Sequence, residues 1–216
     1  MRKGSGRFMI HLKKVRNNFE RRSKAWLDSV DGVRYATDHK ARDILVAHIA
    51  IELQTSLGYV ARSCYLAGML GGRSAAGTTI RALSKHTQLS ALQLAAAVIK
   101  RSPKQVPGRD EPSWHSGDHL TRVIGAVNPA NSSDILTALG IYPDARKAVL
   151  AVRNFYAHRG RHTLEEIRHV LLTEYAVALA SHPTAYLLNP PSGRPHTFLE
   201  QWIWNYRDIV EAMCGS

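Results

Sequence analysis

The chain has little of what marks several common classes of protein. Its 216 residues include two cysteines, Cys64 and Cys214, too few for a disulfide framework or a four-ligand zinc site. It has no run of about 18 uncharged apolar residues, so no membrane span is predicted. The nearest candidate, residues 44–57, is interrupted by His48, Glu52 and Gln54. The absences predict a protein of a reducing compartment, the cytoplasm, that does not act in a membrane.

Signals for strands and for bound cofactors are also missing. Sustained alternation of apolar and polar residues is absent, and no Asn-Gly or Asp-Gly pair joins two such runs. The chain has no serine-nucleophile elbow, phosphate-binding glycine loop or dinucleotide fingerprint. Two histidine pairs have metal-like i,i+4 spacing, but neither has a clear further ligand apart from Asp118. No cofactor and no metal are therefore expected.

Positive charge is abundant and unevenly distributed. The formal net charge is +12, from 29 Lys and Arg against 17 Asp and Glu, which indicates a polyanionic partner such as nucleic acid or an anionic surface. Residues 1–24 carry nine basic residues and one acid, a net of +8, so the remaining 192 residues contribute only +4. Two-thirds of the excess charge thus belongs to the N-terminal segment.

This N-terminal segment has the spacing of an amphipathic helix. Apolar residues recur on one helical face from residue 8 to residue 30. A basic helix over residues 1–30 is predicted, with its apolar face packed and its basic face open to RNA phosphates. The candidate RNA-binding side chains of this helix are Lys13, Lys14, Arg16, Arg21 and Arg22. An organellar transit peptide, or a solvated basic face without a ligand, are the alternatives.

Helical patterns fill the rest of the chain, so a single all-α domain over residues 1–216 is predicted. A long core helix is expected over 38–70, followed by helices over 91–100, 119–127, 135–139, 143–158 and 163–180. A C-terminal aromatic helix is expected over 197–213. Proline and glycine predict a loop over 101–118, in which Trp114 either stacks on a base or fills the core.

One candidate catalytic motif lies near the end of the helix predicted over 143–158. Arg153, Asn154 and His158 form the pattern R-N-x-x-x-H, directly before Arg159 and Gly160. Spacing alone is weak support, because five arginine–histidine pairs in the chain have a similar separation. The pair at 153 and 158 differs from the others in having the asparagine, a strong apolar stripe on its helix and a glycine stop after the histidine.

The motif resembles the signature of the HEPN superfamily, all-helical domains of which many cut RNA without a metal. The resemblance covers residues 38–181 and implies a helical bundle, a homodimer and a cleft shared between subunits. It implies a metal-independent endoribonuclease, a toxin or phage-defence effector, with an antitoxin or regulatory protein as a further partner. Gly160 departs from one toxin subgroup, which has a tyrosine there. A catalytically inactive HEPN-type module that binds RNA or protein is the alternative, and an unrelated basic helical protein that binds nucleic acid is a third.

The residue types also fit RNA cleavage by themselves. His158 can take a proton from the ribose hydroxyl or give one to the leaving oxygen, and Arg153 can stabilise the negative charge that develops at the phosphorus. On an ideal helix these two side chains point about 140° apart, which predicts that a second surface completes the site. Asn154 is expected to hold a phosphate oxygen or the histidine ring, and Glu52 to support the site from the core helix. Arg159 and Arg161 are further candidate RNA contacts. The structural alternative pairs Arg153 with Glu165 or Glu166.

Overall fold

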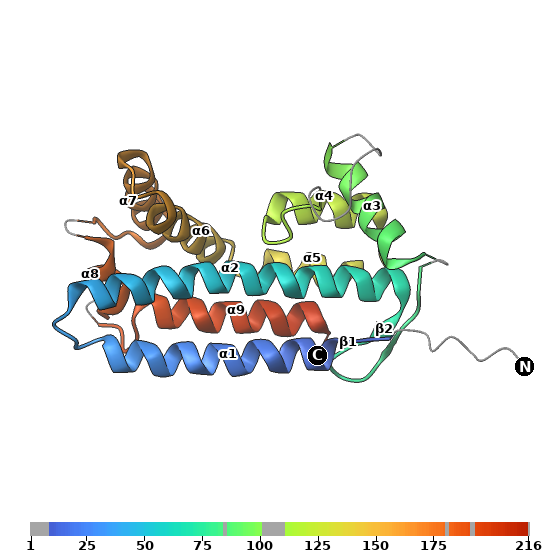
Figure 1. The fold of residues 1–216 in the computed structure, drawn as a ribbon, viewed down its shortest axis with the longest axis horizontal. Helices are drawn as coiled ribbons and strands as arrows, with labels where there is room; N and C mark the ends of the chain where they lie inside the picture. The colour runs from blue at the N-terminus through green and yellow to red at the C-terminus, as the bar shows by residue number, and fades with distance from the viewer. Residues whose placement is uncertain (1–8, 84–85, 101–110, 180–181, 191–192, 216) are drawn as a thin grey trace, which may run out of the picture. The chain divides into compact units, whose positions relative to one another are not determined.

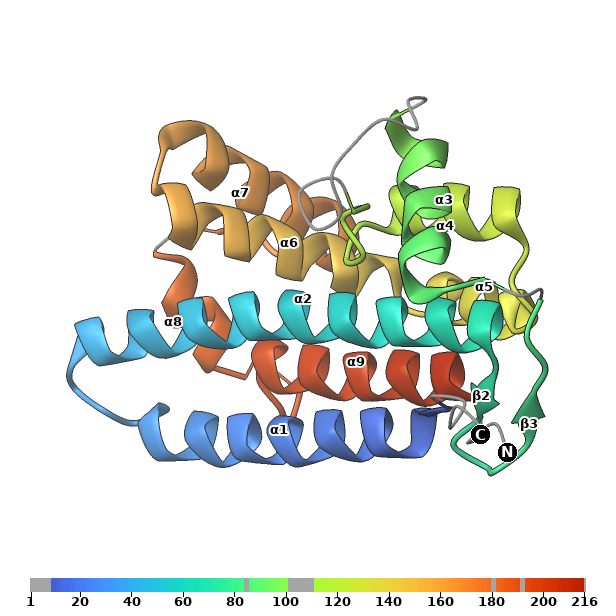
Figure 2. The same cartoon turned by 45° about the vertical axis from the view of Figure 1, so that its right-hand side comes forward.

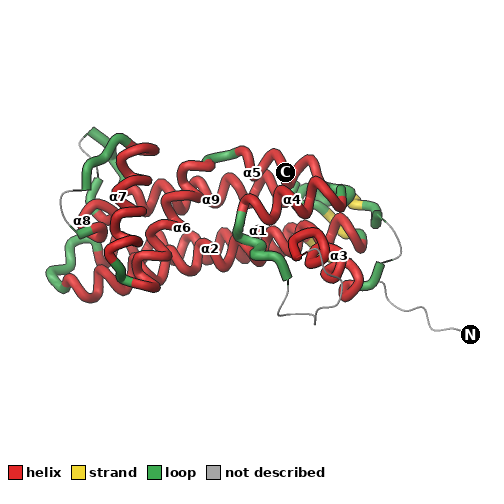
Figure 3. Tube along the Cα trace, turned by 90° about the horizontal axis from the view of Figure 1, so that it is seen from above, coloured by secondary structure: helices red, strands yellow, loops and turns green. Residues whose placement is uncertain are grey.

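The computed structural model describes residues 9–83, 86–100, 111–179, 182–190 and 193–215 (Figure 1). Helices dominate these residues, and the strands among them are three two-residue segments (Figure 3). The helices are α1 (Leu12–Val33), α2 (His39–Leu70), α3 (Gln88–Lys100), α4 (Gly117–Val127), α5 (Ser132–Gly140), α6 (Pro143–His158), α7 (Arg161–Tyr175), α8 (Pro183–Leu188) and α9 (Phe198–Cys214). The strands are β1 (Ile10–His11), β2 (Gly72–Arg73) and β3 (Thr79–Ile80). The predicted all-α fold class is confirmed.

The chain divides into two compact units. The first unit contains residues 1–17, 58–139 and 210–216, and the second contains residues 18–57 and 140–209. Helices α1, α2 and α9, and α5 by its last residue, therefore contribute residues to both units. The single domain expected from the sequence stays a prediction.

The first unit holds the small sheet, in which β1 directly precedes α1 and β2 begins two residues after the end of α2 (Figure 2). Strand β1 pairs in parallel with β2, and β2 pairs antiparallel with β3. The first pairing requires glycine at position 72, because a Cβ there would lie 2.6 Å from the carbonyl oxygen of Ile10. The pairing of β1 also explains why α1 begins only at Leu12. Residues 1–8 of the predicted basic helix lie outside the described residues.

The core of the first unit includes Trp114, as one of the two alternatives for this residue predicted. Trp114 is 7% exposed and its ring centroid lies 5.1 Å from that of Tyr65. Its indole Nε1 donates to Glu111 Oε2 at 2.8 Å, and Arg62 holds both oxygens of the same carboxylate, at 2.7 and 3.0 Å. The aromatic ring is therefore fixed inside the protein. Residues 101–110 of the predicted loop lie outside the described part of the chain.

The second unit buries the later part of the apolar stripe of α1 and most of the aromatic residues of α9. Phe19, Trp26 and Val30 are all buried, which confirms the predicted packing face of α1. Trp202 is fully buried, and its Nε1 donates to the hydroxyl of Tyr175 at 2.9 Å. Helices α6 and α7 pack against each other and belong wholly to this unit (Figure 2).

Helix α2 has the burial expected of a core helix. By length and composition alone it is long and apolar enough to cross a bilayer, but 56% of its apolar 18-residue window is buried inside the protein. Val46, Ile49 and Leu53 lose nearly all their accessible surface. Burial of this apolar surface stabilises the fold, at about 1.5–3 kcal/mol for each large aliphatic side chain.

Several predicted boundaries were wrong for identifiable reasons. The helix predicted over 163–180 begins at Arg161, because Gly160 is its N-cap and the Thr163 hydroxyl accepts from the Gly160 N–H at 3.1 Å. It ends at Tyr175, because Ala176 has a left-handed backbone with φ of 55°. Helix α8 had no counterpart among the predicted elements. The short helices α3, α4 and α5 each begin two or three residues before their predicted starts.

Candidate functional site at the end of helix α6

The predicted motif occupies the last two turns of α6, in the second unit. The helix ends at His158 as predicted, but the residue that ends it is Arg159. Arg159 has a left-handed backbone with φ of 42°, and its N–H donates to the carbonyl oxygen of Phe155 at 2.6 Å. Gly160 is extended, with φ of −101°, and caps the start of α7. The expected glycine stop therefore acts one residue earlier, at an arginine.

Asn154 supports the neighbouring arginine. Arg153 Nη1 donates to Asn154 Oδ1 at 3.1 Å, and both side chains are half-buried. The Asn154 oxygen is therefore bonded to the guanidinium, and the expectation that Asn154 holds a phosphate oxygen or the histidine ring stays a prediction. Glu165, one of the two acids suggested as partners of Arg153, instead pairs with Arg161 at 2.9 Å. The arrangement orients the guanidinium and leaves it with further donors.

His158 is exposed and faces a different direction from Arg153. The side chain of His158 is accessible at the last residue of α6. Because α6 is helical throughout this segment, the two side chains leave it about 140° apart. Tyr156 lies about 60° from Arg153 and about 160° from His158 around the same helix. The fold therefore places the two predicted catalytic residues at one helix end but not on one face.

A hydrogen-bonded cluster, which we call the Asp43 cluster, fixes the end of α6 to the start of α2. It consists of Asp43, Tyr156, His182 and Thr184. The Thr184 hydroxyl donates to Asp43 Oδ1 at 2.5 Å and is hydrogen-bonded to the hydroxyl of Tyr156. His182 Nδ1 lies 3.2 Å from Thr184 Oγ1 and 3.6 Å from Asp43 Oδ1. Burial raises the pKa of Tyr156, so this phenol stays protonated and can donate to Thr184.

Ring contacts place His182 against the same turn of α6. The centroid of its imidazole lies 5.7 Å from that of Phe155 and 6.4 Å from that of Tyr156. The guanidinium of Arg159 lies over the ring of Tyr156, 5.9 Å from its centroid. A second histidine and a second arginine thus flank the motif helix on the side of Tyr156.

A cavity of about 390 Å³ opens beside the Asp43 cluster, within the second unit. It is lined by the start of α2 and the start of α8: His39, Arg42, Asp43, His182, Thr184 and Ala185. The Nε and Nη2 atoms of Arg42 are buried and have no hydrogen-bond partner among the described residues. None of these six residues was singled out from the sequence as a site residue, because the signal is their proximity in space.

Glu52, predicted to support the motif, is hydrogen-bonded to Arg22 of α1. Its side chain is 23% exposed, and the pair joins two helices of the second unit. The carboxylate of α2 that is linked to α6 is instead Asp43, nine residues earlier. Both acids lie on the predicted core helix, and only tertiary packing distinguishes them.

The predicted RNA-binding cations differ in their environments. Lys13, Lys14 and Arg21 are exposed on α1, whereas Arg16 and Arg22 are half-buried. Arg22 pairs with Glu52, and its guanidinium lies 5.7 Å from the ring centroid of Trp26. Arg159 and Arg161 are exposed after α6, although Arg161 is paired with Glu165. Each exposed cation is accessible to a phosphate of a polyanion.

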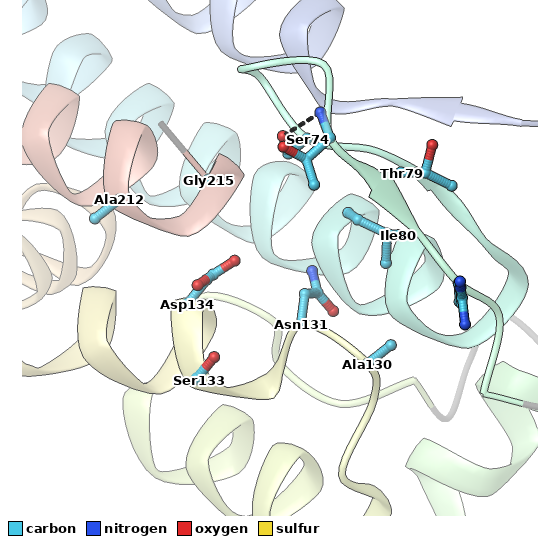
Figure 4. Close-up of a pocket in the computed structure, with 11 residues that line it drawn as sticks. Ser74, Thr79, Ile80, Ala130, Asn131, Ser133, Asp134, Ala212 and Gly215 are labelled. Carbon is cyan, nitrogen blue, oxygen red and sulfur yellow. Dashed lines mark hydrogen bonds between the residues drawn. The ribbon is translucent and has the colours of Figure 1, made fainter.

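A second cavity, of about 440 Å³, lies in the first unit (Figure 4). Figure 4 shows Asn131, Ser133 and Asp134 on one side and Ser74 and Thr79 on the other. Its lining residues are Ser74, Thr78, Thr79, Ile80, Arg81, Ala130, Asn131, Ser133, Asp134, Ala212 and Gly215. This set has hydroxyl groups, one carboxylate and one guanidinium but no histidine, so it offers no proton carrier for RNA cleavage near neutral pH.

Comparison of the chain with protein-family models, with curated proteins and with solved structures finds no match. The resemblance to HEPN proteins therefore stays a prediction that rests on Arg153, Asn154 and His158.

Proposed function

We propose that this protein is a metal-independent endoribonuclease of HEPN type. The observation that carries the proposal is the end of α6, where Asn154 holds the guanidinium of Arg153 and His158 is exposed at the last helical residue. The positive charge of the chain supports RNA as the substrate, because cations that replace condensed counterions drive binding to phosphates. The protein would act in the cytoplasm.

The proposed reaction is an attack within the RNA itself. The ribose 2′-oxygen forms a bond to the adjacent phosphorus, and the bond from phosphorus to the 5′-oxygen of the next nucleotide breaks. One imidazole accepts the 2′-hydroxyl proton, and an acid protonates the leaving 5′-oxygen. The products are a 2′,3′-cyclic phosphate and a free 5′-hydroxyl. Arg153 stabilises the additional negative charge at phosphorus, because its guanidinium is always charged and can bind two phosphate oxygens.

A second copy of the chain would complete the site. Arg153 and His158 diverge by about 140° on one helix, so they cannot both face one phosphate from a straight α6. A twofold dimer that brings two α6 ends together would place Arg153 of one copy near His158 of the other. Each of the two sites would then hold one His158 imidazole and one Arg153 guanidinium. A toxin or phage-defence role, with an antitoxin or regulatory protein that covers this end of α6, follows from the same proposal.

Cleavage of RNA in EDTA tests the proposal. Wild-type protein is expected to cut, and His158→Ala and Arg153→Ala are expected to lower the rate by about 10²–10⁴. His169→Ala is the matched control, because His169 is an exposed histidine of the neighbouring helix α7 and should not change the rate. Chemical analysis of the new ends should find 2′,3′-cyclic phosphate and 5′-hydroxyl groups. Equal cleavage by His158→Ala and wild type would refute the assignment, and RNA binding without cleavage would favour the inactive module.

A further inference from the structure

We propose that the cavity beside the Asp43 cluster binds one nucleotide, with its phosphate on Arg42 and its hydrogen-bond donors on Asp43. The cavity has a volume of about 390 Å³, at the small end of the range of about 300–1,000 Å³ for ligand pockets. Such a volume suits a ligand of the size of a nucleotide rather than a large cofactor.

Arg42 supplies the first half of the recognition. Its Nε and Nη2 atoms are buried without a hydrogen-bond partner among the residues that the structure describes. A buried donor without an acceptor costs free energy, and a ligand that brings acceptors recovers it. The fork of Nε and Nη matches two oxygens of a phosphate group, and such charge-assisted pairs are strong. A modest rotation of the guanidinium toward the cavity that it lines would bring these atoms to the ligand.

Asp43 supplies the second half. Its Oδ1 already accepts from Thr184 at 2.5 Å and lies 3.6 Å from His182 Nδ1. Its Oδ2 has no hydrogen bond within the described ranges and remains able to accept one. The carboxylate repels a bare anion but attracts the donors of a ribose or a base. The lining therefore favours a ligand that carries both a phosphate and several N–H or O–H groups, which is the composition of a nucleotide.

Two imidazoles at the cavity suit the base. His182 and His39 both line it, and the side chain of His182 is 51% exposed. Unstacked bases of RNA pack against the planar rings of histidine and other aromatic side chains. The ring of His182 is held by edge contacts with Phe155 and Tyr156, which leaves a positioned surface for a base.

The cavity is coupled to the end of α6 through Thr184, which is bonded to Tyr156. Tyr156 lies three residues after Arg153 and two before His158. A nucleotide in the cavity would therefore sit against the helix that carries the proposed active site. We assign the nucleotide to a bound RNA strand, as a neighbour of the cleaved linkage, and this source rests on the proposed function. A free mononucleotide is the other source of the same chemistry.

Isothermal titration calorimetry with the full chain tests the cavity without any reference to cleavage. Adenosine, guanosine, cytidine and uridine 5′-monophosphates are the first probes, and inorganic phosphate is the second. At least one mononucleotide should bind wild type more tightly than phosphate does. Arg42→Gln should weaken that binding about tenfold or more, and Asp43→Asn should weaken the nucleotide but not inorganic phosphate. Arg168→Gln, at an exposed arginine of α7, should bind as wild type does. Mononucleotide binding that is unchanged by Arg42→Gln, or absent from wild type, would overturn the proposal.

Two further measurements keep the result interpretable. Thermal unfolding shows whether each variant is folded. If Arg42→Gln proves to be unfolded, wild-type protein is used instead. A photoreactive 4-thiouridine 5′-monophosphate should then crosslink to residues of the cavity such as His39 or His182. Crosslinks that fall only elsewhere would overturn the proposal.

The source of the nucleotide is tested with a short RNA on His158→Ala. Adding Arg42→Gln to this variant should weaken RNA binding about tenfold, whereas Arg168→Gln should not. If mononucleotides bind but Arg42→Gln does not weaken RNA binding, the cavity is supported as a nucleotide site and its assignment to the RNA strand is overturned. Nucleotide binding in a protein that never cuts RNA would separate a failure of the proposed function from a failure of the cavity.

Discussion

Arg62, Glu111 and Trp114 show how a single carboxylate fixes its surroundings. The pKa of Glu111 is lowered, chiefly by its hydrogen bond with Arg62 and also by the donor of Trp114, while burial acts in the opposite direction. Both oxygens of Glu111 accept from Arg62, and one also accepts from Trp114. The ionised form is therefore the one that the folded protein stabilises.

This lowered pKa predicts a loss of stability in acid. A carboxylate whose folded pKa lies below its unfolded value, about 4.3 for Glu, stabilises the fold above that value. The contribution disappears as the pH falls through the folded pKa. Glu111→Gln should lower the free energy of unfolding by about 1–2 kcal/mol at pH 7, and the difference from wild type should shrink at pH 3. Urea denaturation at the two pH values measures it.

Glu174 is the control for this prediction. It pairs with Lys147 at 2.8 Å on the surface, where the lysine side chain is 59% exposed. Exposed pairs of this kind contribute about 0–1 kcal/mol, so Glu174→Gln should have a small effect at both pH values. If Glu111→Gln lowers the free energy of unfolding by the same amount at pH 7 and pH 3, the role assigned to the charge of Glu111 is contradicted.

At the scale of elements, α2 and the segment before α5 approach each other closely within the first unit. The side chain of Asn131 donates from Nδ2 to the carbonyl oxygen of Cys64 at 3.0 Å. A Cβ on Gly68 would lie 2.1 Å from Asn131 Oδ1 and 2.7 Å from Pro129 Cβ. Only glycine at position 68 allows the segment before α5 to lie directly against α2.

Gly68→Ala should therefore destabilise the protein by about 1–3 kcal/mol, the usual cost of inserting a methyl group into a packed contact. Gly125→Ala in α4 is the matched control. A Cβ there meets nothing within 4 Å, so this change should be neutral or stabilise by about 0.5–1 kcal/mol. Thermal unfolding of the two variants decides between these outcomes, and equal melting temperatures would argue against the close contact.

The elements could be predicted from the sequence where local signals specify them. Pro143 and the apolar spacing predicted α6 from its first residue to His158, and the stripe of Phe19, Trp26 and Val30 predicted the packed face of α1. Helix α8 could not be predicted, because its six residues are too few for a periodic pattern. The end of α7 depends on a left-handed alanine, for which composition gives no signal.

The candidate site was predictable only in part, because local signals specify some of its residues and tertiary packing specifies the others. Arg153, Asn154 and His158 are adjacent in sequence, so a motif could identify them. Asp43 and His182 come from segments 139 residues apart, and only the tertiary structure brings them to Thr184 and Tyr156. Glu52 was predicted to support the site because it is a lone acid in the apolar middle of the core helix, and the sequence does not say which acid of α2 is linked to α6.

At the scale of the whole molecule, charge and symmetry decide what the motif can do. Two-thirds of the net charge of +12 belongs to residues 1–24, and exposed lysines of α1 carry part of it. Under the proposed function this charge would attract RNA without selecting a sequence. The proposed catalysis, by contrast, would need Arg153 and His158 at one phosphate, which their divergence on α6 prevents within one copy. The proposed function therefore predicts a dimer with two identical composite sites.

Mixing two inactive variants tests this central claim most directly. In a dimer of Arg153→Ala with His158→Ala, one site loses both residues and the other keeps both. RNA cleavage in EDTA should be nearly absent for each variant alone. After the two are mixed and allowed to exchange subunits, it should return to about a quarter of the wild-type rate, because half the dimers then hold one of two sites. A mixture as inactive as its components, with subunit exchange confirmed by native mass spectrometry, would contradict the shared site.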